Sequence, residues 1–113
     1  MSRPSHAAPV AADPASVFAA LGDRTRLALL TRLSDGADRS ITGLSADTTL
    51  TRQAVTKHLR VLERAGLVRQ VRVGRESRFA GQPSALAEAR IYLDRVSAHW
   101  DESLLRLRKM VED

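Results

Sequence analysis

The chain has 113 residues, no cysteine, and 18 Lys or Arg against 13 Asp or Glu, a net charge of +5. This length fits one domain with a small core, and the absence of cysteine excludes disulfides, thiolate metal sites and cysteine nucleophiles. No apolar run approaches the roughly 18–20 residues of a membrane span, and the N-terminus lacks the apolar core of a signal peptide. We therefore expect a cytoplasmic protein that does not contact a membrane.

The chain is expected to begin with a tail. Residues 1–12 are small, proline-bearing and aperiodic, which predicts disorder ahead of a single domain over residues 13–113. Asp13 followed by Pro14 is a favourable helix start, and Gly22 closes a first helix of about two turns.

Two more helices are predicted before residue 48. Asp23 is placed to cap a helix over 24–33, whose apolar stripe we expect to consist of Leu27, Leu30 and Leu33. A short helix over 42–47 follows and directs Ile41 and Leu44 inward.

A fourth helix is predicted over 52–65. Thr51 supplies its N-terminal cap, and Gly66 suits the left-handed residue that commonly ends a helix. The three-residue turn Thr48–Leu50 joins it to the preceding short helix, so that the pair forms a helix-turn-helix.

A β-hairpin is predicted next. Residues 67–73 alternate apolar and basic side chains, Gly74-Arg75 is a turn signal, and residues 76–80 return as a second strand. Its inward side chains are expected to be Val71, Val73 and Phe79.

The last predicted element is a helix from Pro83 to about Val111. Its apolar residues step by three or four along one side: Leu86, Ala89, Leu93, Val96, Trp100, Leu104, Leu107 and Val111. Such a side must be covered, either by intrachain packing alone or, more completely, by the same helix of a second copy. For that homodimer the expected interface residues are Val17, Phe18, Leu86, Leu93, Val96, Trp100, Leu104 and Leu107.

This order of elements predicts a mainly α, α+β winged helix fold: a winged helix-turn-helix with a two-stranded wing and a long C-terminal dimerisation helix. The positive charge is concentrated in the helix and hairpin of this motif. Residues 51–80 hold eight Lys or Arg against two Glu, a net +6, so the rest of the chain is at −1. Such a cluster is the electrostatic footprint of a nucleic-acid-binding protein.

The fourth helix has two distinct faces on a helical wheel. Val55, Leu59 and Leu62 form the apolar face; on the opposite side lie Gln53, Lys57, Arg60 and Arg64, with Thr56 beside them. Gln can pair with adenine, Arg or Lys with guanine, and Thr with a phosphate or a thymine methyl. A solvated helix face is the alternative interpretation.

His58 and the wing arginines leave more than one role open. His58 lies at the edge of the apolar face, where a histidine usually makes a local hydrogen bond, although it could donate to a phosphate. Arg72, Arg75 and Arg78 surround the hairpin turn and could contact a minor groove or its phosphates, or protect a sheet edge from aggregation.

The segments LGDRTRLALL, TRQAVTKHLRVLERAGLV and RVGRESRF resemble the ArsR family of bacterial winged-helix repressors, and the similarity extends over about residues 17–100. The resemblance implies a homodimeric repressor bound to double-stranded DNA at a palindromic operator. The expected DNA-binding residues are Thr51, Arg52, Gln53, Thr56, Lys57, His58, Arg60, Arg72, Arg75 and Arg78.

The chain departs from the metal-sensing members of that family. Thr42 and Ser45 stand where those members carry cysteines, and hydroxyls do not replace thiolates for a soft metal. The terminal helix offers Asp94, His99, Asp101 and Glu102 without the carboxylate and histidine spacing of the other sensor site. We expect no metal and no cofactor, and the effector stays open.

The sequence has two alternative interpretations, a protein-binding module and an enzyme. A winged helix that binds an acidic protein partner in place of DNA would also use the basic surface. An enzyme would need a catalytic constellation, and the sequence offers no phosphate-binding glycine loop and no recognisable nucleophile with its base.

Overall fold

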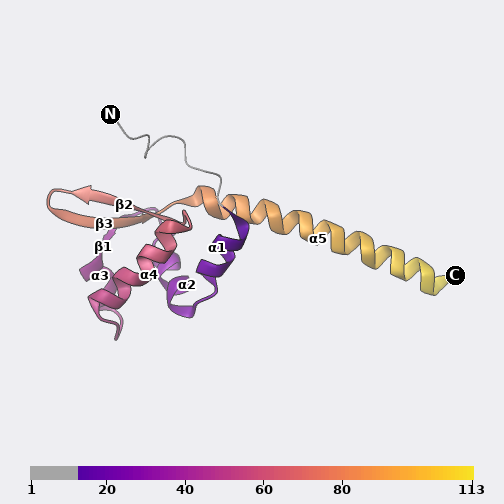
Figure 1. Cartoon of the computed structure of the whole chain (residues 1–113), viewed down its shortest axis with the longest axis horizontal. Coiled ribbons are helices and arrows are strands. Elements are labelled where there is room, and N and C mark those ends of the chain that lie inside the picture. Colours follow the sequence, from indigo (N-terminus) through magenta and orange to yellow (C-terminus); the bar gives the residue numbers. More distant parts are fainter. Residues whose placement is uncertain (1–12) are drawn as a thin grey trace, which may run out of the picture.

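The computed structural model describes residues 13–113, and the predicted tail over residues 1–12 lies outside them. The elements are α1 (Pro14–Leu21), α2 (Arg24–Arg32), β1 (Arg39–Ser40), α3 (Ile41–Ala46), α4 (Arg52–Arg64), β2 (Val68–Val73), β3 (Glu76–Gly81) and α5 (Pro83–Glu112). Figure 1 shows α1–α4 and the sheet gathered at one end of the molecule, with α5 projecting away from them as a long rod.

The helix boundaries follow from local capping. Asp23 accepts a hydrogen bond from the backbone N–H of Arg26 at 3.0 Å, and Thr51 accepts one from Ala54 at 3.0 Å. Gly66 has a φ of +80°, which glycine adopts without the strain that a Cβ brings. These caps place the helices within a residue or two of the predicted bounds.

The sheet has one strand more than predicted. Its order is β1-β3-β2, and both neighbouring pairs are antiparallel. The two residues of β1 pair with β3, Arg39 opposite Phe79 and Ser40 opposite Arg78. The predicted hairpin is confirmed as β2 and β3. In the three-stranded sheet β3 is the central strand, with β2 on one side and β1 on the other.

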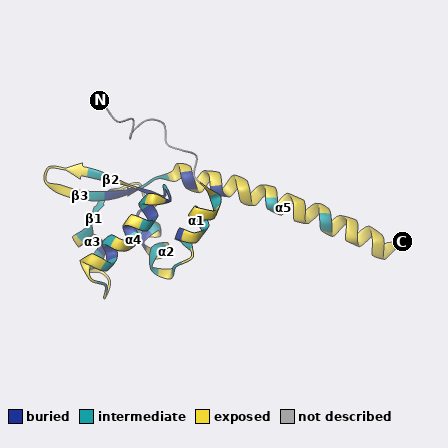
Figure 2. Ribbon diagram, viewed as in Figure 1, coloured by how far each residue is buried: buried dark blue, intermediate teal, exposed yellow. Residues whose placement is uncertain are grey.

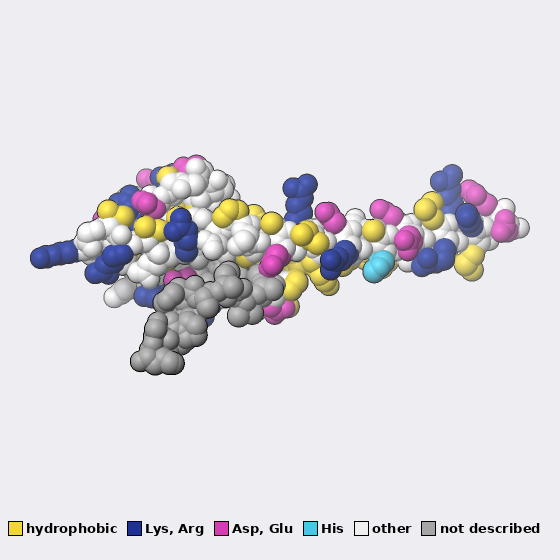
Figure 3. Space-filling view, turned by 90° about the horizontal axis from the view of Figure 1, so that it is seen from above, with side chains coloured by type: hydrophobic (Ala, Val, Ile, Leu, Met, Phe, Trp, Pro, Cys, Tyr) yellow, Lys and Arg dark blue, Asp and Glu magenta, His cyan; other side chains and the backbone are white. Residues whose placement is uncertain are grey.

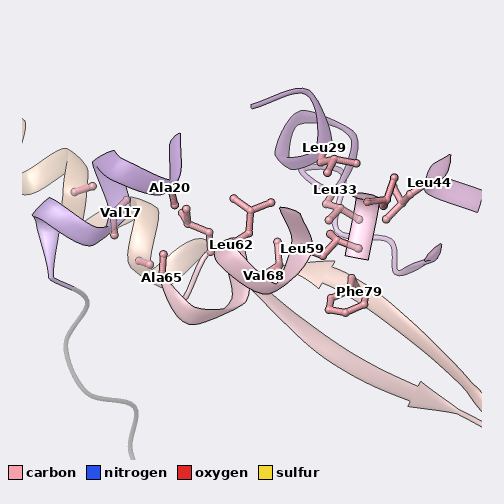
Figure 4. Close-up of a cluster of buried hydrophobic side chains, with 14 residues drawn as sticks. Val17, Ala20, Leu29, Leu33, Leu44, Leu59, Leu62, Ala65, Val68 and Phe79 are labelled. Atoms are coloured by element: carbon pink, nitrogen blue, oxygen red, sulfur yellow. The ribbon is translucent and has the colours of Figure 1, made fainter. Parts of the chain in front are cut away.

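The core lies between α1, α2, α3 and α4, the first turns of α5 and the base of the β2–β3 hairpin (Figure 4). Val55, Leu59 and Leu62 are completely buried, which confirms the apolar face predicted for α4. The prediction for α2 was wrong in one position: Leu27 is 47% exposed and Leu29 only 2% exposed. The face that meets the core carries Leu29 and Leu33, four residues apart, and Leu27 lies on the other side of the helix.

Two further assignments are corrected, one to the inner side of the hairpin and one to the dimer interface. Val73 is 50% exposed because it lies beside the turn of the hairpin, where the core has ended. Val17 was expected at a dimer interface, but its side chain is completely buried in the chain's own core, so it offers no surface to a partner.

Only the first turns of α5 are covered within the chain. Ala85 and Ala89 are buried, and the ring of Tyr92 lies 6.0 Å from that of Phe18 on α1, centroid to centroid. Figure 2 shows that the remainder of α5 is almost entirely exposed, and Figure 3 shows apolar side chains recurring along it. None of the helices between residues 13 and 113 combines the length and the apolar character needed to cross a membrane.

Candidate nucleic-acid interface

The outward face of α4 carries the predicted base-contacting side chains. Gln53, Lys57 and Arg60 are exposed, and within residues 13–113 neither Gln53 nor Lys57 has a side-chain hydrogen bond or ion pair. Arg60 lies 3.8 Å from Glu63 in an exposed pair, which holds it only weakly. These three side chains are therefore available to a ligand.

The two threonines at the start of α4 have local roles. Thr51 caps the helix, and Thr56 donates its hydroxyl to the backbone carbonyl of Arg52 at 2.7 Å. The hydroxyl oxygen of each threonine can still accept a hydrogen bond, but the hydroxyl proton of Thr56 is already donated to Arg52. A phosphate at this point would rely on backbone N–H groups of the first turn and on Arg52.

The start of α4 and the wing border one concave surface. A shallow hollow is lined by Arg52 together with Arg75 at the hairpin turn, and by Thr42 at the start of α3. A second hollow is lined by Gln53 and Lys57, and both hollows share Arg52 and Ile41. The fold thus brings Arg52 at the start of α4 and Arg75 at the wing tip, which lie 23 residues apart in the chain, to the same side of the molecule.

The wing arginines differ from one another in their surroundings. Arg78 donates from Nε to Asp38 at 2.6 Å and from a terminal guanidinium nitrogen to Glu76 at 2.7 Å, and these hydrogen bonds raise its pKa. Arg75 is exposed at the turn, and Arg72 reaches the hydroxyl of Ser77 only at 3.4 Å. Arg75 and Arg72 are free to contact DNA, whereas Arg78 holds the wing to the loop before β1.

Arg78→Ala is expected to lower the melting temperature, because it removes a charge-assisted hydrogen bond that joins β3 to Asp38 and a second one, to Glu76, within β3. Arg75→Ala should leave the melting temperature unchanged, since within the described part of the chain Arg75 makes no such contact. Thermal denaturation of both variants checks the difference, and equal melting temperatures would contradict the anchoring role of Arg78.

His58 belongs to a polar cluster on the side of α4 that faces α1 and α2. Its Nδ1 lies 3.4 Å from the guanidinium of Arg26 and 4.0 Å from Asp23. Arg26 also donates to the carbonyl of Ala20 at 2.6 Å. The backbone N–H of Arg26, more than any nearby charge, lowers the pKa of Asp23. The geometry thus favours the structural role of His58 over a phosphate contact.

Some arginines of the helix-turn-helix make contacts inside the fold, so the number of arginines is larger than the number available to DNA. Arg26 was not singled out in the sequence, although its spacing of three from Asp23 is typical of a capped first turn. Arg32 donates to the carbonyl of Leu44 at 2.8 Å and pairs with Asp47 at 3.1 Å, so it joins α2 to α3. Arginines of this kind hold the helices of the motif together.

Of the two hydroxyls that stand where metal-sensing members carry cysteines, that of Ser45 makes an ordinary helix contact. Ser45 donates to the carbonyl of Thr42 at 3.1 Å within α3. Between residues 13 and 113, no three His, Asp or Glu side chains come close enough together to hold a metal ion.

The known proteins most informative about this chain are transcriptional regulators. Residues 21–71 match a helix-turn-helix domain family. The chain is 32% identical over 99 residues to the HTH-type transcriptional regulator Rv2034 of Mycobacterium tuberculosis. The matched region covers 88% of this chain and 89% of that protein. It is 42% identical over 66 residues to the uncharacterized HTH-type transcriptional regulator YuzN of Bacillus subtilis, covering 53% and 72%.

A solved structure gives the same result for the fold. An ArsR-like transcriptional regulator from Rhodococcus sp. RHA1 superposes with a TM-score of 0.76 and 42% identity, over 86% of this chain and 91% of that one. Fold and sequence together define a winged helix-turn-helix, DNA-binding transcriptional regulator. The chain belongs to the ArsR family of these regulators, as its recognition-helix and wing segments predicted.

Proposed function

We propose that the protein is a homodimeric repressor that places two copies of α4 in successive major grooves of a palindromic operator. The observation that carries this proposal is the concave surface shared by α4 and the wing. Its exposed basic side chains are Arg52, Lys57 and Arg75, which make no side-chain hydrogen bond or ion pair within residues 13–113.

Base contacts are assigned to the exposed face of α4. Gln53, Lys57 and Arg60 follow one another along this face, and their side chains match adenine and guanine edges in the major groove. Phosphate contacts are assigned to Arg52 and the first turn of α4, whose free N–H groups and helix dipole favour an anion.

The wing is assigned to the flanking backbone. Arg75 at its tip and Arg72 beside it are exposed, and the hollow shared with Arg52 sets Arg75 next to the start of α4. A two-stranded ribbon in this position can follow the neighbouring minor groove, where arginine is favoured by the negative potential.

The dimer is inferred from the uncovered apolar side of α5. Leu93 is 52% and Trp100 64% exposed, and Leu104 and Leu107 continue the same side. Contiguous apolar surface of this kind marks a protein interface. A twofold arrangement of α1 and α5 would present two α4 helices to half-sites about 34–36 Å apart, the pitch of one DNA turn.

The test is fluorescence anisotropy with DNA from the gene's own promoter, against random competitor DNA. With six to ten phosphate contacts, affinity should fall about 10³–10⁵-fold between 50 and 200 mM salt. Binding without preference over competitor would overturn the operator proposal and favour a winged helix that binds an acidic protein. Lower transcription from that promoter in the presence of the protein is the result expected of a repressor.

Lys57→Ala should weaken operator binding by about 1–3 kcal/mol, because it removes a base-edge contact, and should relax sequence preference at one position. Lys109→Ala is the matched control, since Lys109 is exposed at the far end of α5. Anisotropy on the operator and on single-base variants measures both effects. An equal loss on all sequences would assign Lys57 to a phosphate.

A further inference from the structure

A recess lies where the end of α2, the start of β2 and the junction of β3 with α5 meet. Its volume is about 230 Å³. Leu33 and Leu67 form a buried floor, while Leu86 of α5 is partly exposed and lies on the rim. Among residues 13–113, no charged side chain lines the recess. The recess is thus apolar, uncharged and separate from the concave surface of α4 and the wing.

We propose that this recess binds a neutral, mainly apolar small molecule of about two fused rings, and that its binding changes the affinity for DNA. An apolar cavity of about 150 Å³ holds benzene, and the larger volume here leaves room for a second ring. A charged ligand would lose its hydration without gaining a counter-charge, which is costly. The carboxamide of Gln82 has no hydrogen bond within the described chain and could orient one polar atom of the ligand.

The recess touches both the DNA-binding part of the chain and the start of α5. A Cβ on Gly81 would lie only 2.7 Å from the carbonyl oxygen of Leu33, so the β3–α5 junction is in direct contact with the end of α2. The N–H of Gln82 also donates to the carbonyl of Leu67 at 2.8 Å. A molecule wedged between Leu30 of α2 and Pro83 of α5 therefore presses on both helices.

A bound molecule would change DNA affinity only through the dimer. If α5 joins the two copies, its exit angle sets the distance between the two α4 helices, and a change in that angle alters the fit to two half-sites. This step rests on the proposed function, whereas ligand binding to the recess does not.

The binding test is an NMR titration of the ¹⁵N-labelled protein with 2-naphthol. Gly36 and Gly81 line the recess, and Gly74 at the wing turn is remote from it, so the glycine amides carry their own control. We expect the Gly36 and Gly81 amides to shift and that of Gly74 to stay unchanged. 2-Naphthoate, which differs by its carboxylate, should bind roughly tenfold more weakly or worse. Equal binding of the two, or no shift at Gly36 and Gly81, would overturn the proposal.

Ser34 lines the recess and is exposed, so Ser34→Phe places a large side chain at its rim. Ser84→Phe is the matched control, since Ser84 is exposed in the first turn of α5 and does not line the recess. The first variant should bind 2-naphthol roughly tenfold more weakly and the second should bind like the unmodified chain. Loss in both variants, or in neither, would place the ligand elsewhere and overturn the proposal.

The regulatory part is measured on promoter DNA at saturating 2-naphthol. We expect the dissociation constant to change by about fivefold or more, and this change to be absent in Ser34→Phe. Binding to the recess without any change in DNA affinity would overturn the regulatory role. The NMR titration is done without DNA. Its result therefore stands even if the operator proposal fails, and the two failures can be told apart.

Discussion

Replacing Leu93 and Trp100 together by glutamate should separate the proposed dimer and weaken operator binding by about 10²-fold or more. Both side chains are more than half exposed, so the charges would lie on the uncovered side of α5 and leave the folded core intact. Two like charges from each copy would face one another across the twofold axis, and each monomer would contact a single half-site. Sedimentation analysis measures the mass, and anisotropy the affinity.

The control for that variant is Arg95→Gln with Ala98→Glu. It lowers the net charge by the same two units, but on the side of α5 away from Leu93 and Trp100. It should remain dimeric and lose only the general electrostatic attraction to DNA. Trp100 is also the single tryptophan, so its emission should shift to longer wavelength when the unmodified protein is diluted. A Leu93→Glu/Trp100→Glu variant that stayed dimeric would disprove the α5 interface.

Phe79→Ala should lower the free energy of unfolding by about 3–5 kcal/mol, because it opens a cavity that the surrounding helices cannot close. Phe79 is 1% exposed on the central strand, opposite Arg39 of β1 on one side and Gln70 of β2 on the other. For a domain of this size that is a large part of the total stability. Urea denaturation gives the value.

Val73→Ala is the comparison within the same hairpin. Val73 lies one residue before the turn and is half exposed, so its truncation should change stability little. Comparable losses for Phe79→Ala and Val73→Ala would mean that the hairpin is stabilised along its whole length, and not through Phe79 at its base.

The sequence was most informative where a structure depends on neighbouring residues. Asp13, Asp23 and Thr51 each cap the helix that follows, and Gly66 ends α4 as its left-handed conformation requires. The apolar face of α4 was predictable because its spacing allows only one such face. The recognition-helix and wing segments carried the family assignment, which the related regulators confirm.

Features that depend on distant residues could not be predicted. β1 has two residues, too few for any alternation, and it exists only because β3 offers an edge. On α2, four leucines permitted two stripes, and the packing of α4 decided between them in favour of Leu29 and Leu33. Arg26 and Arg78 have local partners in Asp23 and Glu76, but the contacts that join them to other elements, with His58 and Asp38, are 32 and 40 residues away and could not be predicted from a local charge pattern.

The attachment of the wing has a consequence for the kinetics of binding. β3 pairs with β2 along its length and with β1 at Arg78 and Phe79, and Arg78 also donates to Asp38, so the base of the ribbon has its shape without DNA. Such preorganisation spares the conformational entropy that a loop loses when it orders on a ligand. Association should then be limited by diffusion and electrostatic steering, and not by a folding step. The association rate constant should accordingly fall as ionic strength rises, with a single kinetic phase.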